Sequence, residues 1–371
     1  TEERQMLQDT LRRFLADRYD TSVRNAILES DAGYSSDIWA QFAELGVIGA
    51  LFTEDQGGFG GAGFDIATVF EEMGRAGVVE PLLDTALLCG GLLAAVGKQD
   101  LVDEVIAGTC QLALAHGEPG ARYDLAHVTT RAETSGDTIR VSGRKAVVVN
   151  AEAADYMIVS AREEGGASDE HGISLFLVPR DAPGMSLTGY PLISGGRAAE
   201  IVLDGVTLSD ADRLGERGAG FTALRDRLAA AHVALSAEAL GAMETATVLT
   251  RDYMMTRQQF GRPIGTFQAL QHRMADLMVE VEQARSAVIL AAGHLETDPT
   301  TRDLNTAAAR NLIGRVGRLV AEETIQLHGG IAMTQEYELA HIAKRIVMTD
   351  HRFGDTDYHL ERFIALGRDA A

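Results

Sequence analysis

Two stretches of this sequence carry residues whose side chains suit the binding of phosphates. In the first, Arg257 is followed closely by Gln259 and Phe260, and a planar guanidinium forms paired, charge-assisted hydrogen bonds to phosphate oxygens. In the second, Gly329 and Gly330 are adjacent, and glycine lets a phosphate approach the main chain without a clash with a β-carbon. Taken alone, Arg257 would be interpreted as a surface ion pair, and the two glycines as a helix C-cap.

A third stretch, HRFGDTDYHLERF from His351 to Phe363, carries a carboxylate that could act as a general base. If Asp355 lies in an apolar site, burial raises the pKa of its carboxyl toward a range useful for proton transfer. A solvent-facing loop aspartate is the common alternative. His232, in the helical segment LAAAHVALSAEALG, is a second titratable side chain, and we interpret it as an ordinary helix histidine.

Composition limits the classes of partner. The chain of 371 residues has a net charge of −21, which argues against nucleic acids and anionic membranes, because both require clustered Lys and Arg. Cys89 and Cys110 lie in apolar or Gly-rich surroundings without metal-ligand spacing, so we predict two buried thiols and no metal site. The N-terminal residues are charged and amphipathic, and no apolar run reaches the length of a membrane span. These features predict a cytoplasmic protein.

Three segments of the chain differ in their hydrophobic pattern. Residues 1–110 have the pattern of helices separated by glycine-rich breaks. Residues 111–212 contain short Val-, Ile- and Leu-rich runs bounded by turn signals, so we predict an antiparallel barrel or sandwich. Residues 213–371 are helical, and an apolar stripe from Phe267 to Val288 is long enough for a bundle helix. The predicted fold class is α+β, with an N-terminal helical domain, a middle antiparallel β domain and a C-terminal helical domain.

Five motifs occur in the order that is typical of one enzyme family. They are FTEDQGG at 52–58, GEPGA at 117–121, GRKAVVVN at 143–150, RQQFGRPI at 257–264 with Phe267 and Gln268 after it, and QLHGG at 326–330. On these motifs the chain resembles the acyl-CoA dehydrogenases along nearly its whole length. The resemblance implies a four-helix bundle at the C-terminus, FAD as cofactor and an acyl-CoA as substrate. It also implies a base that takes a proton next to the thioester carbonyl, and an electron-transfer flavoprotein as electron acceptor.

In this family each FAD site is shared between neighbouring subunits, so its two halves can be inspected separately in one sequence. The half that reaches into the neighbour's site holds the pyrophosphate and adenosine part, and its motifs are intact here. By resemblance, its cofactor-binding residues are Arg257, Gln259, Phe260, Phe267, Gln268, Gln326, Leu327, Gly329 and Gly330.

The half that holds the flavin ring departs from the family pattern. The first threonine of the family's TEPGAGSD motif is Gly117 here, and its Gly-Ser pair is Arg122-Tyr123. The flavin-contacting tryptophan of the GxKxWITN motif aligns with Val147 and its threonine with Val149, and we predict that both valines are strand core. The chain's own β domain is therefore predicted to hold a flavin poorly.

The family's catalytic glutamate is missing at both places where it is usually found. In the YEGT pattern, Phe353 matches tyrosine, Gly354 replaces glutamate and Thr356 matches threonine. Some family members carry the base on the first long helix of the C-terminal domain, and the family spacing puts Ala231 at that position. Asp355 lies one residue after the position of the family's glutamate, and its side chain is one carbon shorter than that of glutamate.

These departures favour a subunit that has no catalytic residue of its own and completes the FAD site of a partner. The resemblance implies a homologous catalytic subunit, an α2β2 heterotetramer, and a bulky CoA thioester such as a steroid side-chain intermediate. Two alternatives remain open. One is a homo-oligomeric flavoenzyme with Asp355 as its base, and the other is a scaffold without a cofactor.

Overall fold

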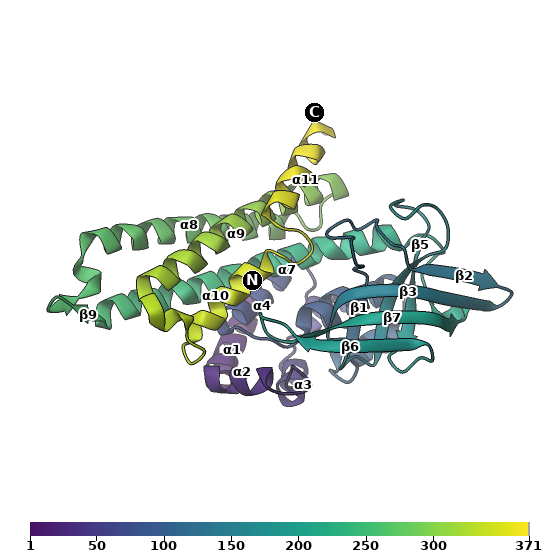
Figure 1. Ribbon diagram of the computed structural model, residues 1–371, viewed down its shortest axis with the longest axis horizontal. Helices are drawn as coiled ribbons and strands as arrows, with labels where there is room; N and C mark the ends of the chain where they lie inside the picture. Colours follow the sequence, from purple (N-terminus) through teal and green to yellow (C-terminus); the bar gives the residue numbers. More distant parts are fainter. Residues whose placement is uncertain (370–371) are drawn as a thin grey trace. The chain divides into compact units, whose positions relative to one another are not determined.

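The computed structural model of the protein describes residues 1–369, and Figure 1 shows their helices and strands. These residues form two compact units. Of the described residues, the helical unit contains 1–26, 62–78 and 232–369. The β unit contains residues 27–61 and 79–231. The N-terminal helices, which the sequence pattern groups together, are therefore divided between the two units.

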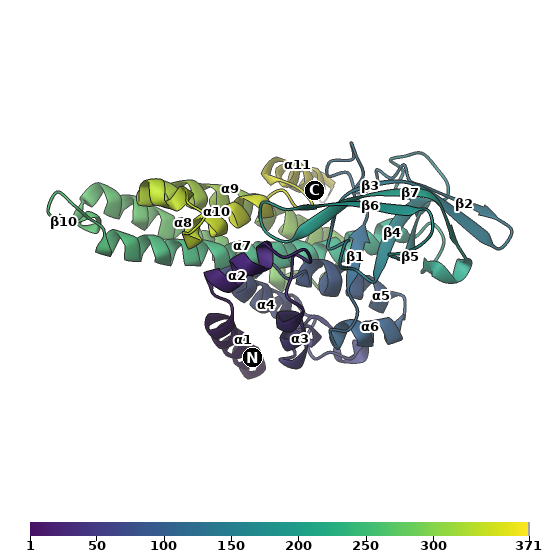
Figure 2. The ribbon, with the colours of Figure 1, turned by 60° about the horizontal axis from the view of Figure 1, so that its bottom comes forward.

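The helical unit is organised around α9, because α8, α10 and α11 all pack against it, and Figures 1 and 2 show α8 and α9 side by side. Asp298 caps the start of α9 by accepting hydrogen bonds from the N–H groups of Thr300 and Thr301. The elements of this unit are α1 (Glu2–Arg18), most of α2 (Thr21–Leu28), α4 (Gly63–Ala76), α7 (Gly220–Thr256) from His232 on, the hairpin β9 (Gln258–Gln259) and β10 (Arg262–Pro263), η5 (Ile264–Thr266), α8 (Gln268–Gly293), α9 (Pro299–His328), η6 (Gly329–Met333), α10 (Glu338–Thr349) and α11 (Thr356–Asp369).

Two features of the helical unit follow directly from its sequence. The apolar stripe predicted for residues 267–288 lies in α8, where Met274, Leu277 and Val281 are buried, although Met278 is 56% exposed. Gly74 of α4 and Gly241 of α7 allow these helices to cross closely. A β-carbon on either glycine would collide with a main-chain carbonyl of the other helix.

The β unit contains one sheet with the strand order β6-β7-β3-β2-β4-β5-β8, and β1 pairs with β4. The predicted antiparallel pairing is confirmed for β2–β3, β3–β7, β4–β5, β5–β8 and β6–β7, whereas β4 pairs in parallel with both β1 and β2. The strands are β1 (Leu112–Ala115), β2 (Arg131–Ser135), β3 (Thr138–Val149), β4 (Tyr156–Arg162), β5 (Ile173–Pro179), β6 (Met185–Pro191), β7 (Arg197–Leu208) and β8 (Arg213–Leu214).

The helices of the β unit come before the sheet along the chain, apart from η4 and the first turns of α7. They are α3 (Ser36–Glu44), η1 (Gly49–Leu51), η2 (Glu54–Gln56), the fully buried π-helix η3 (Leu82–Gly90), α5 (Gly91–Ala95), α6 (Gln99–Ile106) and η4 (Asp210–Asp212). β2 and β6 are not predicted from the sequence, because neither contains an apolar run. Four of the five residues of β2 are exposed, and every residue of β6 is exposed or half-buried. Throughout residues 1–369, no helix is long and apolar enough to cross a membrane.

Candidate functional site

The motif around Arg257 lies on an exposed hairpin at the C-terminal end of α7. Arg257, Gln259 and Phe260 all face solvent, and Phe260 is 91% exposed. Phe260 and Gly261 both have positive φ, which is the backbone of a tight two-residue hairpin turn. Among residues 1–369, no carboxylate forms an ion pair with Arg257. The guanidinium is therefore available to an anionic ligand from outside the chain.

The start of α8 supports this hairpin. The guanidinium of Arg262 lies over the ring of Phe267 at 4.2 Å, and the Phe267 ring in turn meets that of Phe260 edge to face at 6.1 Å. Gln268 follows as the first residue of α8 and is exposed. Phe267 is half-buried, and its ring packs against that of Phe260. Phe260 itself is exposed and presents an aromatic face to solvent.

The second motif forms the C-terminal end of α9. Gln326, Gly329 and Gly330 are exposed, whereas Leu327 is only 6% exposed, so that Leu327 can meet a ligand only through its main chain. Gly329 has φ +73 and ends the helix, and its N–H donates to the carbonyl of Ile325. A β-carbon on Gly329 or Gly330 would touch nothing within 4 Å. This end of α9 therefore has open space in front of two bare peptide groups.

In the β unit, the charged residues of two motifs bind each other. The Lys145 ammonium donates to Glu118 Oε1 at 2.7 Å and to Ser160 Oγ at 3.0 Å, and both ionic side chains are buried. Burial acts to raise the pKa of Glu118, but the charge of Lys145 and hydrogen bonds from Lys145, Thr129 and Thr130 outweigh it and lower this pKa to about 2. Burial lowers the pKa of Lys145 to about 8, so the pair is ionised at neutral pH. This ion pair joins the loop at 117–121 to β3.

The prediction that Val147 belongs to the strand core is wrong. Val147 is 56% exposed and has φ +53, because the register of β3 against β7 shifts between Lys145 and Val148. Its N–H donates to Glu200 Oε1, which also accepts from the Tyr190 hydroxyl at 2.7 Å. Val149 is half-buried. The bulge thus presents a small aliphatic side chain at the position where the family pattern has tryptophan.

Strained backbone is concentrated in the motif segments. Left-handed φ is unfavourable for residues other than glycine and is held in place only by the surrounding structure. Within the described part of the chain, the non-glycine residues at positive φ are Arg122, Val147, Asn150, Phe260 and Phe353. All of them lie in or beside the segments that the sequence singled out, in both halves of the motif set. In the flavin-ring half, the bends at Val147 and Asn150 are therefore present although the tryptophan is not.

The loop from Asp350 to Thr356 is held firmly by α9. The Arg310 side chain is fully buried and donates to the carbonyl oxygens of Thr349, Arg352 and Gly354, at 2.9 to 3.4 Å. The Asn311 amide donates to the carbonyl of Thr356 at 3.0 Å. Position 354 therefore has a fixed place in the helical unit.

There is no room for a side chain at position 354. Gly354 has φ +125, which strains any other residue. A β-carbon there would lie 2.6 Å from His359 Nε2 and would collide with the ring of Tyr358. The first turn of α11 thus fills the space next to Gly354.

Asp355 is engaged in a structural interaction. Its Oδ1 accepts a hydrogen bond from the Tyr358 N–H at 2.9 Å, and its carbonyl accepts from the His359 N–H at 3.0 Å. Asp355 precedes the first residue of α11, so its carboxylate caps that helix. The carboxylate that the sequence offers as an alternative base therefore binds main-chain N–H instead.

The His232 and His359 rings meet edge to face at 4.8 Å. Burial, together with the nearby charges of Arg310 and Arg362, lowers the pKa of His359 to about 3 and that of His232 well below its usual range. Both imidazoles are neutral and weakly basic at pH 7. His232 is thus more than an isolated helix histidine, because it packs against the residue that fills the space beside Gly354.

Three family models match consecutive parts of the chain. The N-terminal, middle and C-terminal domains of acyl-CoA dehydrogenase match residues 1–112, 113–206 and 218–365, respectively. This chain belongs to the acyl-CoA dehydrogenase family. Its fold is the α+β fold of that family, as predicted from the motifs.

Named acyl-CoA dehydrogenases are similar to the chain over nearly its whole length. Acyl-CoA dehydrogenase IpdE2 of Mycobacterium tuberculosis is 32% identical over 352 residues, which are 93% of this chain and 91% of that protein. A solved variant of the Tcur3481-Tcur3483 steroid ACAD is 30% identical, with a TM-score of 0.88 and coverage of 100% and 98%. The ChsE4-ChsE5 complex of Mycobacterium tuberculosis is 23% identical, with a TM-score of 0.87 and coverage of 100% and 97%, and shows a shared fold.

FAD is the cofactor of the acyl-CoA dehydrogenases. Arg257 is exposed and has no ion-pair partner among residues 1–369. Together with the bare aromatic face of Phe260 and the open space at Gly329 and Gly330, it fits a phosphate-linked aromatic group. The bulge at Val147 offers no ring to stack on a flavin. In this member of the acyl-CoA dehydrogenase family, the two halves of the motif set therefore differ in how well they fit FAD.

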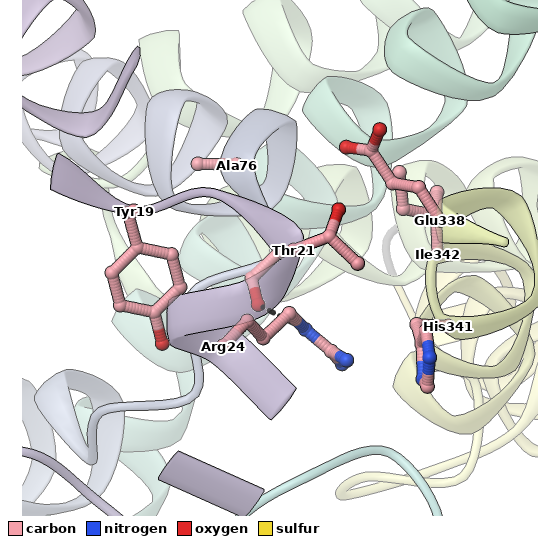
Figure 3. Close-up of a pocket in the computed structure, with 8 residues that line it drawn as sticks. Tyr19, Thr21, Arg24, Ala76, Glu338, His341 and Ile342 are labelled. Carbon is pink, nitrogen blue, oxygen red and sulfur yellow. Dashed lines mark hydrogen bonds between the residues drawn. The ribbon is translucent and has the colours of Figure 1, made fainter. Parts of the chain in front are cut away.

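One polar cavity of the helical unit is too small for any part of FAD or an acyl-CoA. It measures about 10 Å³, which is the space of a single water molecule. Figure 3 shows Glu338 and His341 of α10 on one side of it and Arg24 of α2 on the other. Burial raises the pKa of Glu338 and lowers that of His341, so both groups are less charged than they would be in water.

Proposed function

We propose that this chain is the non-catalytic subunit of a heteromeric acyl-CoA dehydrogenase, and that it completes the FAD site of a homologous partner. The observation that carries the proposal is the contrast between two sites. Beside Gly354 the space for a base is filled by Tyr358 and His359, whereas the Arg257 guanidinium is exposed and unpaired within residues 1–369. Such a chain can contribute Arg257 to an FAD site in a neighbouring subunit, but it has no base at position 354 for catalysis in a site of its own.

The motifs that reach into the neighbouring subunit's site would hold the phosphate and adenosine part of FAD. Arg257 supplies charge-assisted hydrogen bonds, Gln326 offers an amide to adenosine groups, and Gly329 and Gly330 let the cofactor approach the main chain. FAD, when bound, supplies the oxidising chemistry, and the protein positions it. The partner would supply the flavin-ring pocket and the carboxylate base.

The nature of the partner and substrate is supported by the similar proteins. One of the similar solved structures is the Tcur3481-Tcur3483 steroid ACAD, and another is the ChsE4-ChsE5 complex. Each of these names joins two different chains. We infer that this chain likewise assembles with a related but different chain, as an α2β2 heterotetramer. The substrate would be a bulky CoA thioester such as a steroid side-chain intermediate, and an electron-transfer flavoprotein would accept the electrons.

Co-expression tests the proposal. The chain is produced alone and together with a homologous chain that carries the glutamate and tryptophan missing here, and flavin absorbance is measured per polypeptide. We expect the mixed complex to hold one flavin for every two polypeptides and to oxidise an acyl-CoA, and the lone chain to be colourless and inactive. A lone chain that carried a full complement of flavin and oxidised an acyl-CoA would overturn the proposal.

A further inference from the structure

Three aromatic rings from three separate segments pack together next to the exposed motifs of the helical unit. Tyr253 of α7 lies on His328 of α9 with ring centroids 4.4 Å apart and planes 24° apart. Tyr337, just before α10, also meets the His328 ring, at 5.4 Å and 56°. We call Tyr253, His328 and Tyr337 the aromatic stack.

Each ring of the aromatic stack is attached directly to a segment of the proposed cofactor site. The carbonyl of Tyr253 accepts the Arg257 N–H at 2.8 Å in the last turn of α7. His328 is the residue before Gly329, and Tyr337 closes the loop that begins there. The stack is therefore a direct link between the Arg257 hairpin and the glycine loop, which are far apart in sequence.

The central ring is buried and fixed in one orientation. His328 is 5% exposed, and its Nδ1 is 2.8 Å from the carbonyl of Thr324, so Nδ1 carries the hydrogen and donates it. Burial lowers the pKa of His328, which keeps the imidazole neutral and able to stack without a desolvated charge. The ring can thus act as a rigid spacer between two tyrosines.

A second contact fixes the far end of the glycine loop. His341 of α10 is 8% exposed, and its Nε2 donates to the carbonyl of Gln335 at 2.8 Å. Between Gly329 and Gln335 the loop is largely open to solvent, with Ile331 43% and Met333 72% exposed. An exposed glycine-containing loop would lose much conformational freedom on binding a ligand unless it is already held in place.

We infer that Tyr253, His328 and Tyr337 are positioning residues, which hold the Arg257 hairpin and the Gly329–Gly330 loop at the spacing that FAD requires. The inference rests on the proposed function. It adds that the aromatic stack sets the distance between the two motifs that reach into the neighbouring subunit's FAD site. None of the three rings needs to touch the cofactor. Their contribution is to pre-organise two exposed motifs relative to each other.

The test measures FAD affinity of the mixed complex with variants in this chain. Tyr253→Leu removes the ring, and we expect a rise in the dissociation constant of FAD of up to about tenfold, the upper end for an aromatic pair. Tyr253→Phe keeps the ring and should bind FAD within about twofold of the unchanged complex. Tyr34→Leu, which truncates a half-buried tyrosine of the β unit, is the matched control and should leave FAD affinity unchanged.

The outcomes separate this inference from the proposed function. If Arg257→Gln weakens FAD binding and Tyr253→Leu does not, the stack has no positioning role, while the proposed function stands. A loss in Tyr253→Phe as large as in Tyr253→Leu would also overturn the inference, because the hydroxyl and not the ring would then matter. If neither Arg257→Gln nor Tyr253→Leu changes FAD affinity, the proposed function itself fails. Should Tyr253→Leu not fold, Tyr337→Leu and Tyr337→Phe give the same comparison at the other end of the stack.

Discussion

His359 Nε2 lies 2.6 Å from the point where a β-carbon on Gly354 would be placed. The imidazole is 1% exposed and packs edge to face against both His232 and Tyr358. It therefore has little freedom to move aside. Position 354 thus lacks a glutamate, and the side chains of Tyr358 and His359 occupy the space that a side chain at this position would need.

Gly354→Ala should destabilise the chain strongly, and Gly354→Glu should not create a catalytic subunit. Overpacking costs about 1–3 kcal/mol, and the left-handed backbone adds to it. We expect Gly354→Ala to lower the free energy of unfolding by about 2 kcal/mol or more, as measured by denaturant titration. Gly354→Glu should remain unable to oxidise acyl-CoA when FAD is added.

Gly367→Ala is the matched control for this prediction. Gly367 also lies in the α11 region, is exposed, and has open space where a β-carbon would be. Alanine should therefore stabilise the helix there by up to about 1 kcal/mol. A Gly354→Ala protein as stable as Gly367→Ala would show that Tyr358 and His359 rearrange easily, and would remove the packing argument for a closed site.

The sequence predicted the features that depend on local pattern. The order helices, strands, helices and the long helix over residues 267–288 follow from hydrophobic periodicity, and they are present in the structure. The helix C-cap that is one interpretation of Gly329 and Gly330 in the sequence corresponds to the end of α9. These features need no knowledge of tertiary contacts.

Features that depend on register or on contacts between distant residues were not predictable. Val147 looks like the middle of an apolar run, and only the bulge in β3 turns its side chain out to solvent. The approach of His359 to Gly354 depends on the angle at which α11 leaves the loop. The aromatic stack joins residues 253, 328 and 337, whose separation in sequence carries no periodic signal.

Lys145→Met should destabilise the β unit severely, because it leaves the Glu118 carboxylate buried without its cation. Removing one partner of a buried ion pair typically costs about 3–5 kcal/mol. The double variant Lys145→Met with Glu118→Gln should recover part of this loss, since no uncompensated charge then remains. Thermal unfolding of the two variants and the unchanged chain checks the order of stabilities.

The same pair predicts how stability depends on pH. The pKa of Glu118 is lowered in the folded chain from 4.5 to about 2, so its stabilising contribution is complete above pH 4.5 and is lost as pH falls toward 2. In Lys145→Met, burial without the ammonium raises this pKa instead, and the variant gains stability as Glu118 becomes protonated. The stability difference between the two proteins should therefore narrow between about pH 7 and pH 3. A constant difference would contradict the assignment of this ion pair.

Arg257→Gln should weaken FAD binding to the mixed complex without affecting the fold. The side chain is exposed and has no ion-pair partner within the described residues, so its loss should change the free energy of unfolding by less than about 0.5 kcal/mol. Loss of a charged hydrogen bond to phosphate should raise the dissociation constant of FAD by about tenfold or more. Arg251→Gln, which removes a nearby exposed arginine paired with Asp252, is the control and should leave FAD affinity unchanged.

Asp355→Asn distinguishes a helix cap from a catalytic base. Asparagine caps a helix about as well as aspartate, whereas alanine costs about 1 kcal/mol, so only Asp355→Ala should lower the free energy of unfolding. Asp298, which caps α9 in the same way, gives a matched pair of variants that report the cost of losing a cap alone. If Asp355 only caps α11, the mixed complex with Asp355→Asn should oxidise acyl-CoA at the unchanged rate. If turnover disappeared while flavin absorbance stayed the same, Asp355 would be a base, and this chain would be a catalytic subunit.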